Sequence, residues 1–417
     1  MSPHPIVPDA PGLVWRPHTR GWKAFWQCRT DLVNRGFTPK SILLWTGSEP
    51  SKTEIAFIQD NCLRLQDEMK AFSRGGLPQT NPFDGSLRSL INCYQTDTDS
   101  RYHKKRFHVR RQHDSTLKRI AERHGHEELA DIKARILIAW HKDWSDGELK
   151  LSMGQAFIQL LRALFVFGAT ILEDEECDRL CNLLHKMRFK APKKHSESLT
   201  ADQAAAVIAE AHKAGWHSVA LAQAIQFEAL LRQKDVIGEW VPIAEQGPPS
   251  DVTNAGLKWL RGVRWSEVDD NFVLTHETSK KDKPLVVSLI GAPMVAIELA
   301  RIAGICHEVL LTRDMFPVSG PIIVDEGGLP FMSWRFRKRW RLLANEVGIP
   351  RSVKNMDSRS GGITEAEESG APIDHIRRAA THSDVATTEG YIRGKANANA
   401  AKNVMQMRAA HRNKPKD

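Results

Sequence analysis

The feature that most constrains the fold is a change of pattern near residue 190. An almost unbroken helical pattern over 86–185 ends at the basic, proline-containing segment "KAPKKHSES" (190–198). Thr200 then precedes Gln203 at the spacing of a capping box, which predicts that a new helix begins there. We therefore place the main domain boundary in this segment. A chain of 417 residues has room for two or three domains, each with a core of its own.

Two domains are expected before this boundary. Over 1–80, the alternation in "LVWRPHTRGWKAFWQC" predicts a β-hairpin, and "SKTEIAFIQDNCLRLQDEMKAFSRG" has the apolar spacing of a helix, so this part reads as a small α/β unit. Gly, Pro and Asn in "GGLPQTNPFDG" (75–85) indicate a linker. The helical segments over 86–189 then predict a compact domain of four or five helices.

The domain after the boundary is expected to be mostly helical with a small sheet. Helices are predicted to about Trp240, followed by the loop "EQGPPSDVTNAG". Three segments then look like strands: "GVRWSEVD", "NFVLTHET" and "PLVVSL". Helices occupy nearly all of the remainder. The fold class predicted for the whole chain is mainly α with a small β-sheet, that is, α+β.

Positive charge is concentrated in one stretch. The formal net charge is +9 and the pI is near 9.2, which favours an anionic partner such as nucleic acid, although excess charge also serves solubility. Residues 101–126 hold nine Lys or Arg against two acids. This stretch is either a solvated helix face or a surface that follows a phosphate backbone. The candidate DNA-contacting residues are Lys104, Lys105, Arg106, Arg110, Arg111 and Lys118, together with Lys281 further along the chain.

Cysteine usage and hydropathy favour a cytosolic protein. Six cysteines are scattered, and Cys177 and Cys181, four residues apart on an acidic helix, do not form a metal-binding turn. Buried thiols in a reducing compartment explain them better than disulfides. The N-terminus lacks a secretory pattern, and the least polar run, Ala163–Leu172, is too short to span a bilayer.

Four short stretches could carry chemistry, although each alone fits a structural role. Arg232 falls in an apolar helical pattern, where a charge needs a partner. Lys280 falls in the turn of a predicted hairpin, and Arg359 at the start of a predicted helix. The last stretch, "RRAATHSDVATTEGYIRG", contains His382 and Tyr391. Tyr391 is one of only three tyrosines in a chain with twelve tryptophans, which points to a role for its phenolic oxygen.

In order, these residues give Arg…Lys…Arg…His…Tyr, which resembles the tyrosine recombinase (phage integrase) family. "VRWSEVDD" is similar to the strand that follows the first arginine of that family, and "TSKKDKP" to its lysine hairpin. "SRSGGITEAEESGAPIDHIRRAATHSDVATTEGYIR" is similar to its C-terminal block. The resemblance covers about 100–395. It implies a helical, SAM-like core-binding domain over 86–189 and a catalytic domain over 199–396, followed by a basic tail over 397–417.

The resemblance also implies a reaction. A tyrosine attacks a DNA phosphodiester, forms a 3′-phosphotyrosyl link and frees a 5′-hydroxyl, with no metal or ATP. Two arginines suit this chemistry because each guanidinium can donate in parallel to phosphate oxygens, which lysine cannot copy. Carried over residue by residue, the family pattern implies Tyr391 as nucleophile, Arg232 and Arg359 as phosphate clamps, His382 as a donor to the phosphate, and Lys280 as general acid with Lys281 as the alternative.

One position departs from the family pattern. A histidine usually lies three residues before the second arginine, and here Met356 occupies that position. A methionine cannot take the proton of a phenol, whose ordinary pKa is about 10. Either His382, a phosphate oxygen or the clustered positive charge serves instead, or activity is reduced. Asp357, the next residue, is expected to cap the helix.

The implied partner is double-stranded DNA carrying attachment sites, bound by a tetramer, with an accessory DNA-bending or directionality protein as a further expectation. The setting would be a prokaryotic cytoplasm, at the nucleoid, with no membrane. Two rivals remain: a regulator of the same fold with weakened catalysis, and a type IB topoisomerase. The unit over 1–80 is either an arm-type DNA-binding domain or a scaffold; its basic residues among aromatics are Arg16, Arg20, Lys23 and Arg29. In the tail, "KNVMQMRAAH" is a helix that either passes to a neighbouring protomer or folds back.

Overall fold

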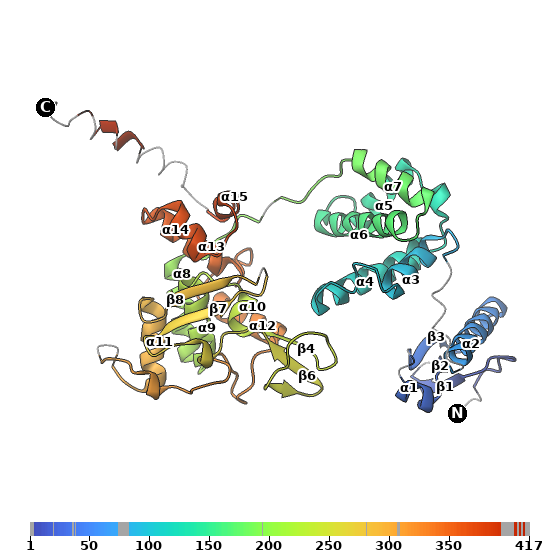
Figure 1. Ribbon diagram of the computed structural model, residues 1–417, viewed down its shortest axis with the longest axis horizontal. Helices are drawn as coiled ribbons and strands as arrows, with labels where there is room; N and C mark the ends of the chain where they lie inside the picture. Colours follow the sequence, from blue (N-terminus) through green and yellow to red (C-terminus); the bar gives the residue numbers. More distant parts are fainter. Residues whose placement is uncertain are drawn as a thin grey trace. The chain divides into compact units, whose positions relative to one another are not determined.

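The computed structural model describes residues 4–392 except 20, 36, 38, 74–82, 194, 281 and 307–308, together with 404–406, 408–409 and 412 of the tail. The chain divides into two compact units, Met1–Pro192 and Lys193–Asp417 (Figure 1). The further division of the first unit into domains over 1–80 and 86–189 stays a prediction. The tail helix predicted at "KNVMQMRAAH" and residues Arg20 and Lys281 lie wholly or partly outside the described residues.

A small antiparallel sheet backed by a helix begins the first unit. The predicted hairpin is confirmed as β1 (Leu13–His18) and β2 (Gly21–Gln27), and β3 (Ser41–Gly47) pairs with the other edge of β2. A short α1 (Thr30–Asn34) joins β2 to β3, and the predicted long helix is α2 (Lys52–Ser73). Ala24 and Trp26 of β2 are buried with Ile58 and Cys62 of α2, because alternate residues of a strand face one side of its sheet.

A helical bundle completes the first unit, and all of the helices predicted for it are present. One described helix, α6 (Leu151–Thr170), is long and apolar enough to cross a membrane, whereas the sequence predicted an apolar run too short to do so; half of its most apolar stretch is buried within the bundle. Phe157, Leu161 and Phe165 of α6 are fully buried at the centre of the core. The elements are α3 (Leu87–Thr96), α4 (Phe107–His124), the 3-10 turn η1 (Leu129–Asp131), α5 (Ala134–Trp144), α6 (Leu151–Thr170) and α7 (Glu175–Lys186).

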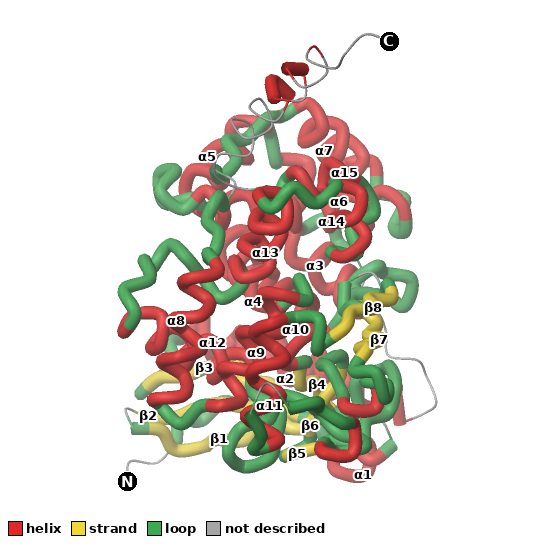
Figure 2. Tube along the Cα trace, turned by 90° about the vertical axis from the view of Figure 1, so that its left-hand side faces the viewer, coloured by secondary structure: helices red, strands yellow, loops and turns green. Residues whose placement is uncertain are grey.

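The second unit is built around one buried helix, α9. Its residues from Val219 to Phe227 are buried on every side, and α8, α11, α12 and α13 all contact it (Figure 2). A helix buried all round shows little amphipathic pattern. The helices are α8 (Ala201–Lys213), α9 (His217–Glu228), α10 (Gln233–Ile237), α11 (Pro293–Ala303), α12 (Ser333–Glu346), α13 (Asp357–Glu368), α14 (Ile373–Ala379) and α15 (Val385–Glu389).

Buried polar side chains fix α9 against its neighbours. Gln223 accepts a hydrogen bond from the indole Nε1 of Trp340 on α12 at 2.7 Å, and its amide donates to Ser358 on α13 at 3.1 Å. Gln226 donates to the carbonyl of Asn355 at 3.0 Å. Because buried polar groups are costly without partners, these bonds specify one arrangement of α9, α12 and α13.

The sheet of the second unit differs from the prediction, although the α+β class is confirmed. The segment "GVRWSEVD" is not a strand: it holds a 3-10 turn, η2 (Trp265–Glu267), in which Glu267 accepts from the backbone N–H of Arg264 at 2.8 Å. This side-chain bond competes with strand pairing. The strands present are β4 (Glu239–Pro242), β5 (Thr253–Asn254) and β6 (Leu257–Leu260) in one sheet, ordered β4-β6-β5, and the hairpin β7 (Val273–Glu277) and β8 (Pro284–Ser288).

All six cysteines are free. Four are buried as predicted, and burial raises the pKa of the Cys62 thiol to about 11. Cys306 is exposed, so the expectation of buried thiols is wrong at this position. It follows the left-handed Gly304 that ends α11, where the chain turns away from the core.

Candidate active site

Arg232 lies at a break between two helices, and the prediction that it sits inside a helix is wrong. After α9 ends, Leu230 has a left-handed backbone with φ of +53°, which a leucine adopts only under tertiary constraint. Arg232 itself is extended, with φ of −77° and ψ of 153°, and precedes the first residue of α10. Its side chain is a quarter exposed, so the guanidinium reaches the surface.

Arg359, on the first turn of α13, is almost fully buried. Its two terminal nitrogens donate to the carbonyls of Leu230 and Ala380, and its Nε has no hydrogen-bond partner. Thr381, which follows Ala380, has a φ of +54° and so resembles Leu230 in its left-handed backbone. A left-handed residue therefore lies at or next to each of the two carbonyls. Burial, and then the charge of Arg232, lower the pKa of the Arg359 guanidinium to about 10.

No carboxylate among the described residues forms an ion pair with Arg359. Tyr391 and Asp235 partly stabilise its charge, but burial outweighs them. A buried cation without a direct ion pair is costly, and it creates a position in which an anion is stabilised. The nearby positive charge of Arg232 adds to this effect. The two arginines therefore form a candidate anion site.

His382 contacts Arg359, and this contact fixes the form of the imidazole. Its Nε2 is 2.9 Å from a terminal nitrogen of Arg359, and its Nδ1 is 3.0 Å from the hydroxyl of Thr388. A guanidinium can only donate, so Nε2 accepts, and the ring is neutral with its proton on Nδ1. The Nδ1–H then donates to the buried hydroxyl of Thr388 on α15.

Tyr391 lies beside this histidine. The two rings stack with centroids 5.0 Å apart at 26°, and the Arg359 guanidinium carbon is 5.6 Å from the tyrosine ring. The backbone N–H of Tyr391 donates to the carbonyl of Thr388 at 2.9 Å, and its carbonyl accepts from the Ser360 hydroxyl at 3.3 Å. Tyr391 is half-buried, so its main chain is fixed while part of its ring stays accessible.

Lys280 is exposed in the turn of the β7–β8 hairpin, as predicted from the sequence. The neighbouring Ser279 N–H donates to the fully buried Asp235 at 2.6 Å, and Asp235 also lies 3.9 Å from a guanidinium nitrogen of Arg232. Asp235 therefore connects the lysine turn to the first arginine. Lys281 lies outside the described residues, so the choice between the two lysines stays open.

Met356 and Asp357 take different roles from those expected. The Met356 side chain is 60% exposed and sits at the N-cap of α13. Asp357, expected as the cap, is instead the first helical residue and is buried. One of its carboxylate oxygens accepts from the Lys354 N–H at 2.7 Å, and both lie 2.9 Å from Nε2 of His195. Sequence reasoning missed His195, because nothing local distinguishes it from its basic surroundings.

The five candidate catalytic residues thus gather in the second unit. Arg359, His382 and Tyr391 are in mutual contact, and Arg232 and Lys280 are joined to them through Leu230 and Asp235. No three His, Cys, Asp or Glu side chains of the described residues are placed to hold a metal ion.

Comparisons with known proteins identify the fold. No family model matches the chain, and no curated protein matches it. A lambda integrase dimer bound to a COC′ core site matches with a TM-score of 0.55 at 16% identity, covering 91% of this chain and 94% of that one. A lambda integrase tetramer bound to a Holliday junction gives 0.55 at 14%, covering 93% and 96%. The Tn1549 transposon integrase in complex with circular intermediate DNA gives 0.54 at 11%, covering 76% and 99%.

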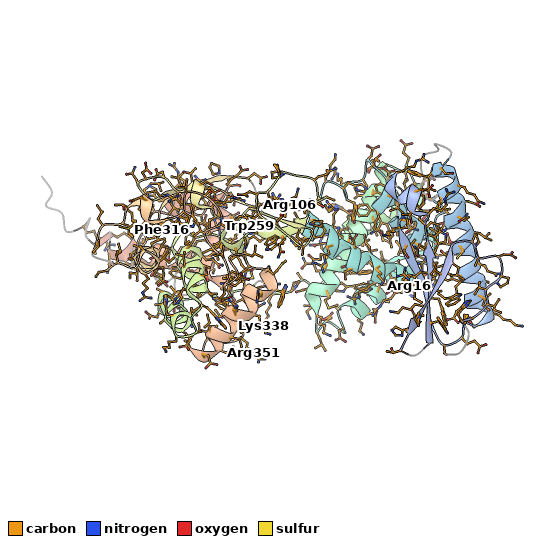
Figure 3. All side chains as sticks on the ribbon, turned by 90° about the horizontal axis from the view of Figure 1, so that it is seen from below. Arg16, Arg106, Trp259, Phe316, Lys338 and Arg351 are labelled. Atoms are coloured by element: carbon orange, nitrogen blue, oxygen red, sulfur yellow. The ribbon has the colours of Figure 1, made fainter. Side chains whose placement is uncertain are left out.

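The chain has the tyrosine recombinase fold. Within this fold, the basic residues predicted from 101–126 lie on α4 and the turn before it, in the first unit, whereas the five candidate catalytic residues lie in the second. Lys104, Arg111 and Lys118 are exposed, although Lys118 is 3.9 Å from Glu122. Lys105, Arg106 (labelled in Figure 3) and Arg110 are half-buried.

A second basic helix of the recombinase fold was missed. The α12 sequence "SWRFRKRWRLLANE" contains five Lys or Arg, a signal that was available in the sequence. Arg335 and Arg339 pair with Asp325 and Glu326, whereas Arg337 and Lys338 remain exposed beside an exposed Trp334 (Figure 3). The second unit therefore carries its own positive surface.

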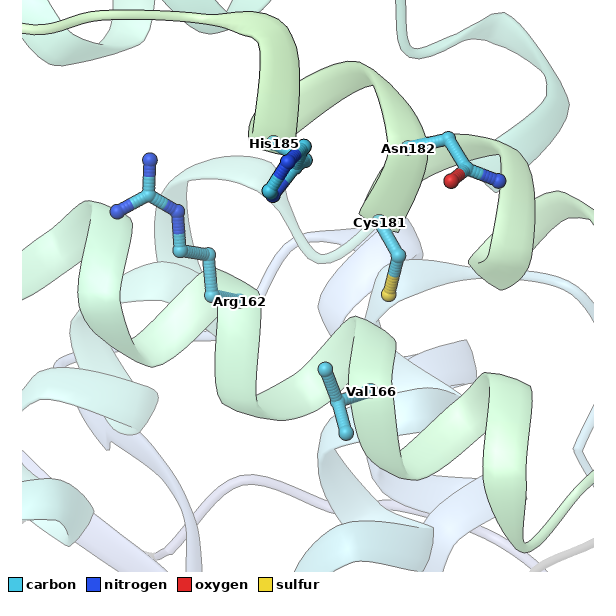
Figure 4. Close-up of a pocket in the computed structure, with 5 residues that line it drawn as sticks. All are labelled: Arg162, Val166, Cys181, Asn182 and His185. Carbon is cyan, nitrogen blue, oxygen red and sulfur yellow. The ribbon is translucent and has the colours of Figure 1, made fainter.

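One pocket of the helical bundle is unrelated to these residues. A cavity of about 320 Å³ lies between α6 and α7, lined by Arg162, Val166, Cys181, Asn182 and His185 (Figure 4). None of the candidate catalytic or DNA-contacting residues lines it. A groove for extended DNA needs no enclosed pocket, so this is consistent with an open site in the second unit.

Proposed function

We propose that this protein is a site-specific DNA recombinase, an integrase of a prophage or integrative element, which cuts and rejoins DNA through a 3′-phosphotyrosyl intermediate. The observation that carries the proposal is the contact of Tyr391 with His382 and with the buried guanidinium of Arg359, which forms no direct ion pair with a carboxylate of the described residues. The recombinase fold and the DNA-bound state of the neighbouring structures support it.

In the proposed reaction, the Tyr391 phenolic oxygen attacks a DNA phosphorus and the bond to the 5′ oxygen breaks. The new bond links tyrosine to the 3′ side, and the leaving 5′ oxygen takes a proton from Lys280 or Lys281. Arg232 and Arg359 stabilise the negative charge that develops on the phosphate oxygens. Attack by a 5′-hydroxyl of a partner strand reverses these events and restores the phosphodiester.

No dedicated base is in place to remove the phenolic proton of Tyr391. His382 stacks on Tyr391 face to face and directs Nε2 towards Arg359, and Met356 cannot accept a proton. We propose that the positive charge of Arg232 and Arg359 lowers the cost of the phenolate once a phosphate is bound, and that a phosphate oxygen or water takes the proton. His382 then positions Arg359 and the tyrosine ring, and donates to the phosphate only after Arg359 releases Nε2 and this nitrogen takes up a proton, for which the phenolic proton is one source.

A nicked suicide substrate tests this proposal, because loss of a short strand traps the covalent complex. We expect wild type to become covalently attached to DNA and Tyr391→Phe to form no adduct. Tyr94→Phe is the matched control: the Tyr94 hydroxyl is buried without a hydrogen-bond partner, so its removal leaves the adduct unchanged. If wild type and Tyr391→Phe trap equally little DNA, the proposed recombinase activity is refuted. The protein would then be a DNA-binding regulator of the same fold, the alternative that Met356 favours.

The partners follow from the same proposal. Duplex DNA would lie against the exposed basic residues of α4 and α12, and strand exchange between two duplexes would require four subunits. We propose that β1–β3 bind a second DNA segment, since Arg16 and Lys23 pair across the face of the sheet opposite α2. Recombinant product from paired attachment sites would support an integrase, whereas plasmid relaxation without recombinants would indicate a topoisomerase.

A further inference from the structure

The segment that leads into the second unit is docked on α13, the helix that carries Arg359. His195 lies 2.9 Å from the Asp357 carboxylate, and the Leu199 N–H donates to the Asp357 carbonyl at 3.2 Å. Leu199 is fully buried in the main core of the unit. The segment 195–199 therefore lies against the first turn of α13 before it enters α8 (Figure 1).

Gly361 shows how closely this segment approaches α13. A Cβ at this position would overlap with the carbonyl oxygen of Leu199. Glycine inside a helix costs about 0.5–1 kcal/mol relative to alanine, so its presence here needs a reason. The close approach of segment 195–199 supplies that reason.

Ser360 joins the docked segment to Tyr391. Its hydroxyl oxygen is 3.3 Å from the carbonyl of Glu197 and 3.3 Å from the carbonyl of Tyr391. A hydroxyl has one proton, so the two carbonyls share or compete for it. Ser360 also directly follows Arg359. One turn of α13 therefore contacts the docked segment and the main chain of Tyr391, and it also carries Arg359 of the anion site.

We propose that segment 195–199 is a positioning element of the nucleophile, with His195 and Ser360 as its positioning residues. This inference rests on the proposed function. Segment 195–199 lies next to the boundary between the two units. Docking of His195 on Asp357 holds the Ser360 hydroxyl near the carbonyls of Glu197 and Tyr391, and so positions the main chain of Tyr391.

The test measures cleavage and DNA affinity separately in the full-length protein. We expect His195→Ala and Ser360→Ala to slow covalent trapping on a nicked substrate by about tenfold, with DNA affinity within about twofold of wild type. His195→Arg keeps a hydrogen-bond donor for Asp357 and should recover most of the rate. His185→Ala, an exposed histidine on α7, is the matched control and should behave as wild type.

A substrate with sulfur in place of the bridging 5′ oxygen distinguishes defects in protonation of the leaving group from defects in positioning of the nucleophile. A thiolate leaves without a general acid, so this substrate should relieve the defect of Lys280→Ala but not that of His195→Ala or Ser360→Ala, which act on the nucleophile. If the sulfur substrate restores both kinds of variant equally, the assignment to the nucleophile is wrong.

Failure of the inference is distinguishable from failure of the proposed function. If wild type forms no adduct at all, the proposed function fails. If wild type forms the adduct and both His195→Ala and Ser360→Ala match it, only the role of segment 195–199 is refuted. A loss of DNA affinity equal to the loss of cleavage would also refute it. Thermal unfolding of each variant, expected to match wild type within a few degrees, excludes loss of the fold as the cause.

Discussion

His382 is held at both ring nitrogens, by Arg359 at Nε2 and by Thr388 at Nδ1. Thr388 also accepts the Tyr391 N–H through its carbonyl. One buried threonine therefore orients both the imidazole and the tyrosine, the first through its side chain and the second through its main chain. A substitution at this residue can change one contact and keep the other.

Thr388→Val tests the side-chain contact. We expect it to slow covalent trapping about tenfold and to lower the free energy of unfolding by about 1–3 kcal/mol, because the buried Nδ1–H loses its acceptor. Thr388→Ser keeps the hydroxyl and should retain most of the activity. Trapping kinetics and urea unfolding of the two variants measure this; equal activity of Thr388→Val and Thr388→Ser would show that the hydroxyl does not matter.

Arg359→Lys tests the guanidinium. A lysine has a single donor nitrogen, which cannot take the places of the two separate Arg359 nitrogens that bind the Leu230 and Ala380 carbonyls. We therefore expect the trapping rate to fall by about 10²–10³, or about 3–4 kcal/mol of transition-state stabilisation. Arg301→Lys, at a half-exposed arginine on α11, is the control and should leave the rate unchanged. A lysine variant that cleaves at the wild-type rate would mean that a point charge suffices.

At the level of elements, His124 of α4 makes the bundle sensitive to acid. Its ring stacks on Trp140 of α5, and its Nε2 lies 3.3 Å from the Trp144 indole N–H, which can only donate. Burial, and then the charge of Arg123, lower the pKa of His124 to about 4. In the unfolded chain a histidine titrates near 6.5. Between these values only the unfolded state binds the proton.

We therefore expect the stability of the bundle to fall as the pH decreases from about 6.5 to 4, and the contribution of His124 to level off below 4. His124→Gln keeps an acceptor for Trp144 but cannot titrate, so its stability should depend less on pH over this interval. Urea unfolding of the full-length protein at several pH values, followed by tryptophan fluorescence, gives the comparison. Identical slopes for the two proteins would contradict the assignment.

Elements with local signals could be predicted from the sequence, and elements defined by distant contacts could not. The β1–β2 hairpin and the capping box at Thr200 follow from nearby residues and are confirmed. The helix break before Arg232 depends on Leu230, whose carbonyl binds an arginine 129 residues away. The His195–Asp357 pair spans 162 residues. No local pattern carries information about such partners, so these parts of the candidate site had to come from the structure.

At the level of the whole molecule, the chain has two compact units, each with its own exposed basic helix. If DNA lies against both, affinity depends on salt, because each neutralised phosphate releases counterions. We expect Arg111→Gln on α4 to reduce the slope of log affinity against log salt by about 0.9. Lys213→Gln, at an exposed lysine paired with Glu210 on α8, should leave the slope unchanged. Binding titrations at several salt concentrations measure it, and equal slopes would place Arg111 outside the interface.

The way in which the main chain binds Arg359 has a consequence for sequence divergence among proteins of this kind. The carbonyls of Leu230 and Ala380 belong to the main chain, so no substitution removes them as long as the backbone keeps its path. Side chains around the arginine, other than His382, can then change without removing these two bonds. Which substitutions are tolerated at residues 230 and 381 should therefore depend more on whether they allow a positive φ than on side-chain chemistry. We expect glycine or asparagine to be tolerated at these positions and proline to be excluded.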